Sequence, residues 1–467
     1  MFDNDGRLLI DTTKSVIMHQ IEAMMNDTYD ESESIAEEPT AVIIFDGMAV
    51  LNKIKLGSGI RNCLQLAEQF LKMVMSEPSD EIRVVFDRYI EDSLKKTTRN
   101  KRQGKLNTST QYEIKEDTNL EKTTMKKLLS HNQTKHQLTL FLGRFLARKL
   151  REINMKFAVS FEKCTLNNIQ SLDTEKLNGH NHEEANTLMI LHAIDVAEYD
   201  PSQKLNVSSP DTDVFLLLMH FHQDLPSDTH FLTGIGDNRR LISISKAQQS
   251  LADRWSSLLG FHAFTGCDTT SKFLGKTKLS CWRTFIKAAP HILEAFKQLG
   301  NLETDNEAIV HGLEAYVCQL YNTKSTEEIC KLRWQLYSQT QDASRLPPTS
   351  AALKFKIMRS HLVCSVWKQS HTTNPRQLNP EEHGWERGED GELTPRLSDE
   401  LPAPEAIVEL CVCSCTKGCI TNRCSCHKIS LVCTDMCQCQ QCENIEGEME
   451  EDKDVNPEWD SEGEENL

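Results

Sequence analysis

The sequence predicts an α/β protein in which helices cover both faces of a mainly parallel sheet, followed by a helical extension and a small cysteine-rich module. Three observations lead to this prediction. Short β-branched runs alternate with amphipathic stretches over residues 41–280, a pattern typical of a parallel sheet between helices. Apolar residues recur at helical spacing over residues 281–371. Ten cysteines lie between Cys411 and Cys442.

The N-terminal extension, residues 1–40, is predicted to be partly helical. Ile17, Ile21 and Met24 recur at helical spacing, and an acidic stretch follows them. Because no clear structural element opens the chain, we expect the reading frame, or that of a natural relative, to extend further upstream.

Residues 41–280 form the predicted sheet domain. Strands are expected at 41–45, 82–86, 157–161 and 205–209, helices at about 57–76, 136–152 and 183–198, and a hairpin at 228–245. The strands are short, apolar and β-branched, and the stretches between them have helical periodicity. This alternation predicts crossover connections and hence parallel strands.

Residues 281–371 are predicted to be entirely helical. Further helices are expected near 282–299, 326–338 and 349–368, with an amphipathic helix that contains Leu313, Tyr316, Val317, Leu320 and Tyr321. We interpret these aromatic stripes as core rather than as a cofactor site, and we expect no small organic cofactor. Residues 372–410, rich in Pro, Gly, Glu and Asn, are predicted to be a linker.

Composition excludes some classes of protein. The net charge of the 467 residues is −17, which argues against a protein that coats nucleic acid through bulk positive charge. Residues 445–467 carry eleven acids and one lysine and are predicted to be a disordered acidic tail. The longest apolar runs are too short to cross a bilayer, so we expect no membrane partner.

Acidic residues cluster at the ends of the predicted elements. Asp46, Asp87, Asp211 and Asp213 follow strands, Glu183 and Glu184 open a helix, and Asp268 lies near a turn. Ligands of open α/β sheets bind at the carboxyl ends of the strands. Asp211 and Asp213 are two residues apart, so in an extended segment both carboxylates point to one side. Each acid alone also fits an ordinary role as a turn or helix-start residue.

Converging carboxylates need counter-charge, because like charges held close together cannot all stay ionised. Hard divalent cations with oxygen ligands, Mg²⁺ or Mn²⁺, provide it. One or two such ions activate water and stabilise the leaving oxygen in phosphodiester cleavage. The acidic set therefore predicts a metal-dependent phosphodiester hydrolase.

The order of these motifs resembles the flap-endonuclease branch of the PIN-like nuclease fold. The resemblance covers residues 41–275 and implies that Asp46, Asp87, Glu184, Asp211, Asp213 and Asp268 hold magnesium or its bound water. One departure is visible. Flap endonucleases usually have two glutamates two residues apart in the helix motif, whereas His182 stands two residues before Glu184, and Glu183 is adjacent. This departure favours the alternative of a catalytically inactive scaffold.

A basic segment follows Asp87. It contains Lys95, Lys96, Arg99, Lys101, Arg102 and Lys105, with no acid among them. In proteins similar to flap endonucleases, this position carries an arch that holds a single strand, and basic residues along a backbone suit that task. A solvated loop and a nuclear-import signal are the alternatives.

The cysteines predict a zinc module at residues 411–444. No secretory signal precedes them, so zinc-binding thiolates are favoured over a disulfide framework. The nine ligands are Cys413, Cys415, Cys419, Cys424, Cys426, Cys433, Cys437, Cys439 and Cys442. Nine thiolates suffice for about three tetrahedral zinc ions if three of them bridge two metals. A cluster of this kind folds a segment too short to bury a core.

The cysteine spacing resembles the CXC domain of tesmin-like chromatin proteins. The resemblance implies a three-zinc module that binds DNA, here with Lys417, Arg423 and Lys428 as the basic contacts. Arg423 stands where the family often has a DNA-contacting tyrosine, and an arginine also enters narrow minor grooves. The alternative is a zinc knot that staples the C-terminus or binds a protein.

Together these features predict a nuclear protein that acts on nucleic acid, with DNA favoured over RNA. A PIN-like nuclease domain at 41–280 would use Mg²⁺ or Mn²⁺, and the zinc module would target it to DNA and chromatin proteins. The alternative is an inactive PIN-like scaffold that binds DNA or chromatin through the zinc module.

Overall fold

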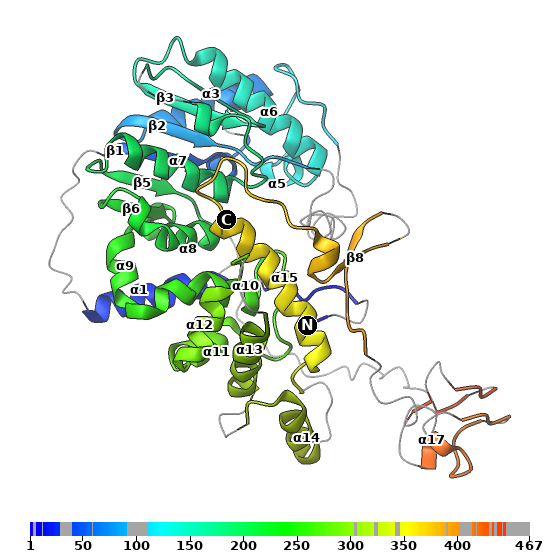
Figure 1. The fold of residues 1–467 in the computed structure, drawn as a ribbon. Helices are drawn as coiled ribbons and strands as arrows, with labels where there is room; N and C mark the ends of the chain where they lie inside the picture. Colours follow the sequence, from blue (N-terminus) through cyan, green and yellow to red (C-terminus); the bar gives the residue numbers. More distant parts are fainter. Residues whose placement is uncertain are drawn as a thin grey trace. The chain divides into compact units, whose positions relative to one another are not determined.

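The computed structural model describes most of the chain. The described residues are 1–2, 6–11, 13–28, 40–57, 59–90, 111–170, 172, 174–302, 306–321, 326–340, 346–388, 391–400, 413–416, 418–428, 432–433, 437–440 and 442–444. They belong to two compact units, Met1–Leu397 and Ser398–Leu467. Figure 1 shows the fold.

A seven-stranded sheet forms the centre of the first unit. Its strand order is β4-β3-β2-β1-β5-β6-β7. The strands are β1 (Thr40–Asp46), β2 (Ser79–Val85), β3 (Lys156–Phe161), β4 (Cys164–Asn167), β5 (Leu205–Ser208), β6 (Thr229–Thr233) and β7 (Arg240–Ser243). The inner pairs are parallel, and β4 and β7 pair antiparallel at the two edges. The predicted α/β class with a mainly parallel sheet is confirmed.

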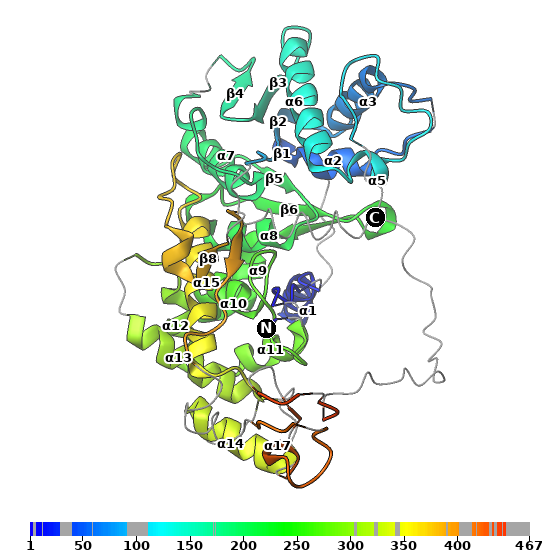
Figure 2. The same cartoon turned by 90° about the vertical axis from the view of Figure 1, so that its right-hand side faces the viewer.

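The sheet is apolar on both faces. Successive residues of β1 point to opposite sides of the sheet, and consecutive residues of this strand are apolar. Val42 and Ile44 belong to one core, and Ile43 and Phe45 to the other. The second core is closed by α2 (Gly47–Lys53), α3 (Cys63–Met75), α5 (Met125–Leu128) and α6 (Asn132–Lys149). The first is closed by α1 (Val16–Thr28), α7 (Ala185–Tyr199), α8 (Thr212–His220), α9 (Ile244–Ser250) and α10 (Leu258–Thr265). Figure 2 shows α2, α3 and α6 on one side of the sheet and α7 on the other.

The helical extension shares the first core. It comprises α11 (Lys278–Ile286), α12 (Pro290–Gln298), α13 (Asn306–Tyr321), α14 (Ile329–Thr340) and α15 (Ser350–Lys368). Phe285, Phe296 and Tyr316 surround Phe261 of α10, with ring centroids 4.4–6.4 Å from that of Phe261. The aromatic stripe of α13 therefore contributes to the hydrophobic core. Among the described helices, none is long and apolar enough to cross a membrane.

Residues 372–397, predicted to be linker, are folded onto α15. A 3₁₀ turn (Pro380–His383) leads into a two-stranded antiparallel ribbon of β8 (Trp385–Arg387) and β9 (Leu393–Pro395). Trp385 is buried with Leu362 of α15. The buried Arg359 donates to the carbonyl oxygens of Gly384 and Arg396, at 2.7 and 2.9 Å. Residues 372–388 and 391–397 are therefore packed, and Gly384 and Gly391 lie at turns of this packed segment, whereas residues 401–410 of the predicted linker lie outside the described residues.

Candidate metal and nucleic-acid site

The carboxyl ends of β1 and β5 meet at one edge of the sheet, where helices begin. Asp46 ends β1 and caps α2, accepting a hydrogen bond from the backbone N–H of Ala49 at 3.0 Å. Asp211 caps α8 and accepts from the N–H of Asp213 at 3.0 Å. The hydroxyl of Ser209 joins the two, since it donates to Asp46 at 3.2 Å and accepts from the N–H of Asp211 at 3.1 Å. The ends of the two strands therefore place Asp46 and Asp211 close together, joined by Ser209.

Asp87 follows β2 at the same edge. Its carboxylate accepts a hydrogen bond from the backbone N–H of Ala185 at 2.7 Å, at the first residue of α7. Burial, followed by the facing charges of Asp87 and Asp211, raises the pKa of Asp46 to about 7 against the hydrogen bonds that lower it. The carboxylates at this edge of the sheet therefore repel one another.

Asp211, Asp213 and Asp268 form an acidic triad whose oxygen atoms lie within 4.8 Å of one another. Asp213 is in the first turn of α8, and its side chain is 2% exposed. In an extended segment, Asp211 and Asp213 are expected to point to the same side. The structure corrects this: both residues belong to a helix start, and their convergence comes from the cap of Asp211 and the first turn.

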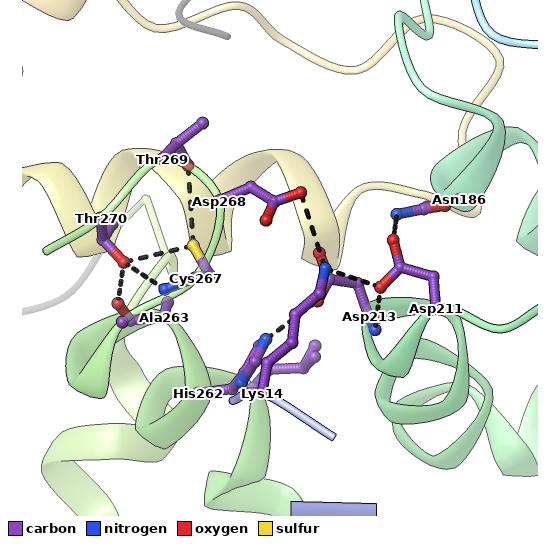
Figure 3. A network of polar contacts seen from close by, with 12 residues as sticks. Lys14, Asn186, Asp211, Asp213, His262, Ala263, Cys267, Asp268, Thr269 and Thr270 are labelled. Carbon is purple, nitrogen blue, oxygen red and sulfur yellow. Dashed lines mark hydrogen bonds and ion pairs between the residues drawn. The ribbon is translucent and has the colours of Figure 1, made fainter. Parts of the chain in front are cut away.

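Lys14 lies among the three acids of the triad (Figure 3). Its ammonium is 2.8 Å from Asp211, 3.3 Å from Asp213 and 3.6 Å from Asp268. Burial lowers the pKa of Lys14, but the three carboxylates outweigh it and hold this pKa well above its ordinary value. No motif surrounds Lys14, so the sequence alone does not indicate this contact.

His262 and Asn186 orient the triad. The Nε2 atom of the fully buried His262 is 3.0 Å from Asp213, and its ring stacks on Trp367. Burial lowers the pKa of His262, and a neutral ring in this position donates its Nε2–H to the carboxylate. Asn186 donates its amide to Asp211 at 3.2 Å. Both were missed by sequence analysis.

The residues two positions before and two positions after Glu184 make different contacts. His182, two residues before Glu184, is buried in bonds to Thr187 at 2.9 Å and to the carbonyl oxygen of Thr372 at 2.8 Å. Asn186, two residues after Glu184, is the one that contacts the acids. Asn186 therefore places an amide beside the acids, while His182 ties α7 to the segment that follows α15.

A pocket of about 470 Å³ adjoins the triad. Its acidic wall contains Glu183, Glu184, Asp213 and Asp268, its basic residues are Arg88, Lys163 and Arg387, and its apolar wall includes Leu362, Val366, Trp367, Leu378 and Leu393. The apolar side comes from α15 and the ribbon. Pockets of this size accommodate small organic groups. The six predicted basic residues between Lys95 and Lys105 lie outside the described residues.

The second unit contains the predicted cysteine cluster. Three groups of four have sulfur atoms within 4.8 Å of one another: Cys413, Cys424, Cys426 and Cys433; Cys413, Cys415, Cys419 and Cys424; and Cys413, Cys419, Cys433 and Cys439. Cys437 lies 3.6 Å from Cys426, and Cys442 packs against the cluster. Lys417 lies outside the described residues, and Arg423 and Lys428 are exposed.

The sulfur separations fit tetrahedral zinc. Cys413 is 3.8 Å from Cys419 and 3.7 Å from Cys433, and Cys424 is 3.8 Å from Cys433. A Zn–S bond of about 2.3 Å gives tetrahedral S–S edges of about 3.8 Å. Cys413 belongs to all three groups, as a bridging thiolate would.

Comparison with solved structures finds nucleases of the flap-endonuclease kind. The T5 D15 protein, co-crystallised with metal ions, is 10% identical, with 71% of this chain and 91% of that chain covered and a TM-score of 0.34. The catalytic core of Rad2 in complex with DNA substrate is 11% identical, with 73% and 83% covered and a TM-score of 0.33. Flap endonuclease-1 from Methanococcus jannaschii is 15% identical, with 56% and 78% covered and a TM-score of 0.29.

These similarities concern the fold alone. No protein-family model matches the chain, and no curated protein matches it.

Proposed function

We propose that the first unit is a nuclease that depends on Mg²⁺ or Mn²⁺ and hydrolyses phosphodiesters of nucleic acid, with DNA favoured over RNA. The observation that carries the proposal is the meeting of Asp46, Asp87 and the Asp211–Asp213–Asp268 triad at the carboxyl edge of the sheet. Glu184 lies beside the triad in the pocket wall.

The residues at this edge fit a hard divalent cation. The donors are carboxylate oxygens, the ligands that Mg²⁺ and Mn²⁺ prefer. The carboxyl of Asp46 is hydrogen-bonded by the neutral groups of Ala49 and Ser209 and faces two further carboxylates. A cation there relieves a repulsion that the fold itself creates.

In this proposal the chain holds and orients the reacting groups. Asp46, Asp87, Glu184 and the triad would bind one or two ions. A bound ion supplies Lewis-acid activation of water and stabilises the leaving oxygen. His262 and Asn186 fix the rotamers of Asp213 and Asp211 through the bonds described above, so that the donor oxygens are preorganised.

The pocket gives the substrate a place beside the acids. Arg88, Lys163 and Arg387 supply positive charge for phosphates, and Val366, Trp367 and Leu378 supply an apolar wall for an unstacked base. An unpaired nucleotide fits this combination better than a continuous duplex, whose bases are stacked inside. The basic residues from Lys95 to Lys105 would extend the phosphate contacts along the strand.

The cysteine module would bind about three zinc ions and dock on DNA. Lys417, Arg423 and Lys428 would contact the phosphate backbone of the DNA. Tethered to the nuclease unit, it would raise the local concentration of that unit at DNA. A nuclear location follows from this proposal, and chromatin proteins are further candidate partners.

The alternative is an inactive scaffold that binds DNA or chromatin through the zinc module. One observation favours it: the ammonium of Lys14 already contacts all three acids of the triad. An internal cation satisfies carboxylates without any catalytic metal.

The test compares wild-type protein with Asp46→Asn on labelled single-stranded, flap and duplex DNA with Mg²⁺ or Mn²⁺. Asparagine keeps a helix cap but removes the charge, so we expect cleavage to fall at least about 100-fold. Asp237→Asn, at an exposed turn, is the matched control and should cut like the wild type. Equal cutting by Asp46→Asn, or none by folded, zinc-loaded wild type, contradicts the proposal.

A further inference from the structure

The position of Lys14 is fixed by the segment that precedes α1. Asp11 accepts from both the N–H and the hydroxyl of Thr13 at 2.8 Å, which shapes the turn before the lysine. The N–H of Lys272 donates to the carbonyl oxygen of Leu9 at 2.7 Å. This segment is therefore attached to the loop that carries Asp268, and α1 beyond it is anchored by Ile17 in the core.

The ammonium of Lys14 occupies the space in which the triad would hold a cation. The three acidic oxygens lie within 4.8 Å of one another, and the ammonium is no more than 3.6 Å from any of the three residues. Figure 3 shows the nitrogen between Asp268 on one side and Asp211 and Asp213 on the other. A divalent ion bound to the same oxygens would meet a like charge at contact distance, so the two cations exclude each other.

Asp46 and the triad differ in the charge of the groups that contact them. The bonds to Asp46 come from the neutral groups of Ala49 and Ser209, whereas the triad has a permanent positive charge at its centre. Lys14 has four methylenes, and its side chain is 20% exposed. Its ammonium can leave by side-chain rotation while the backbone stays attached through Thr13 and α1.

We propose that Lys14 is a built-in counter-ion of the triad, and that a divalent cation binds Asp211, Asp213 and Asp268 only when this ammonium withdraws. The inference rests on the proposed function for the identity of the competing cation. It predicts two unequal metal sites: a stronger one at Asp46 and Asp87, and a weaker one at the triad.

The test is Mn²⁺ binding to the zinc-loaded full chain, measured by calorimetry and by electron paramagnetic resonance. We expect Lys14→Gln to bind a further Mn²⁺, or to bind the weaker one at least tenfold more tightly. Lys14→Arg keeps the positive charge and should bind like the wild type. Lys272→Gln removes a charge from the neighbouring loop, outside the triad, and is the matched control.

A second readout is the melting temperature. Without metal, Lys14→Gln should be less stable than the wild type, because three carboxylates lose their counter-charge, and Mn²⁺ should raise its melting temperature more than that of the wild type. Equal stoichiometry and affinity in the wild type and Lys14→Gln overturn the inference even if the wild type cuts DNA. If neither protein binds Mn²⁺, the inference fails. Absent cleavage would then remove the proposed function as well.

Discussion

Asp46 and Asp213 have the same side chain but differ in how their charge is offset. Burial, followed by the facing carboxylates of Asp87 and Asp211, raises the pKa of Asp46 to about 7, although the hydrogen bonds from Ala49 and Ser209 lower it. Asp213 is more deeply buried, but Lys14 and His262 contact it. A divalent cation therefore gains most near Asp46, and the triad is already partly neutralised.

A half-buried histidine away from the acids predicts how the stability of the protein depends on pH. His361 accepts a hydrogen bond from the N–H of Gly300 at 3.2 Å, and burial, followed by His383 and Lys368, lowers its pKa to about 4. In the unfolded chain His361 binds a proton near pH 6.5, whereas in the folded protein it does so only near pH 4. The contribution of the neutral His361 ring to stability is therefore present above pH 6.5 and is lost as the pH falls toward about 4. We expect His361→Asn to lose less unfolding free energy than the wild type between pH 7 and 5.

The measurement is denaturant unfolding at the two pH values, and the difference should stay below about 1.4 kcal/mol per pH unit, the limit for one proton. His311→Asn, at an exposed position of α13, should leave the pH dependence unchanged. The same pH dependence in the wild type and His361→Asn would show that this ring is not the group that titrates.

The acids could be predicted from sequence, but their partners could not. Asp46 and Asp87 follow β-branched runs, and the carboxyl ends of parallel strands must share an edge. Lys14 lies 199 residues from Asp213, and no local pattern encodes a contact over that distance. His262 lies in a helix whose residues are all buried, so it was not distinguishable from core.

At the scale of elements, helix α8 shows why periodicity failed. Its residues from Thr212 to Met219 are all buried, so no polar face marks the 3.6-residue repeat. No helix is therefore predicted at 212–220 from the sequence, and only the pair Asp211 and Asp213 is considered as part of an extended segment. The ribbon of β8 and β9 could not be predicted for a different reason. Its two apolar anchors, Trp385 and Leu393, are separated by polar residues, and they pack with Leu362 of α15.

The ribbon also closes the apolar side of the pocket, which yields a prediction on substrate binding. Leu378 precedes the ribbon and lines the pocket together with Glu184 and Asp268. Leu378→Glu adds a carboxylate to that wall and should repel phosphate, so we expect affinity for single-stranded DNA to fall about tenfold. Fluorescence anisotropy with a labelled oligonucleotide measures the effect in the presence of Ca²⁺, which limits cleavage.

Leu302→Glu adds the same charge at an exposed position and serves as the control. Both variants should show the wild-type melting temperature within a few degrees. If Leu378→Glu binds single-stranded DNA as tightly as the control, the pocket does not hold the strand.

At the scale of the molecule, the two units have different kinds of core. In residues 1–397, the sheet, α10 and the helical extension share one hydrophobic core, so the acidic edge is supported by packing over several hundred residues. The described part of residues 398–467 has its core in the cysteines themselves. We therefore expect the second unit to depend on metal for its fold and the first unit to fold without zinc.

Cys413 and Cys415 provide the test of this division. Cys413 is buried and belongs to all three groups of sulfur atoms, while Cys415 is half-buried and belongs to one. We expect Cys413→Ala to lose most of the bound zinc and Cys415→Ala to lose about one ion of roughly three, because only the first removes a shared thiolate.

Zinc per chain is measured by mass spectrometry, and unfolding by tryptophan fluorescence. The main unfolding transition should be the same in both variants, since the described tryptophans lie in the first unit. Equal zinc loss would contradict a bridging role for Cys413, and a lowered main transition would show that the two units are coupled.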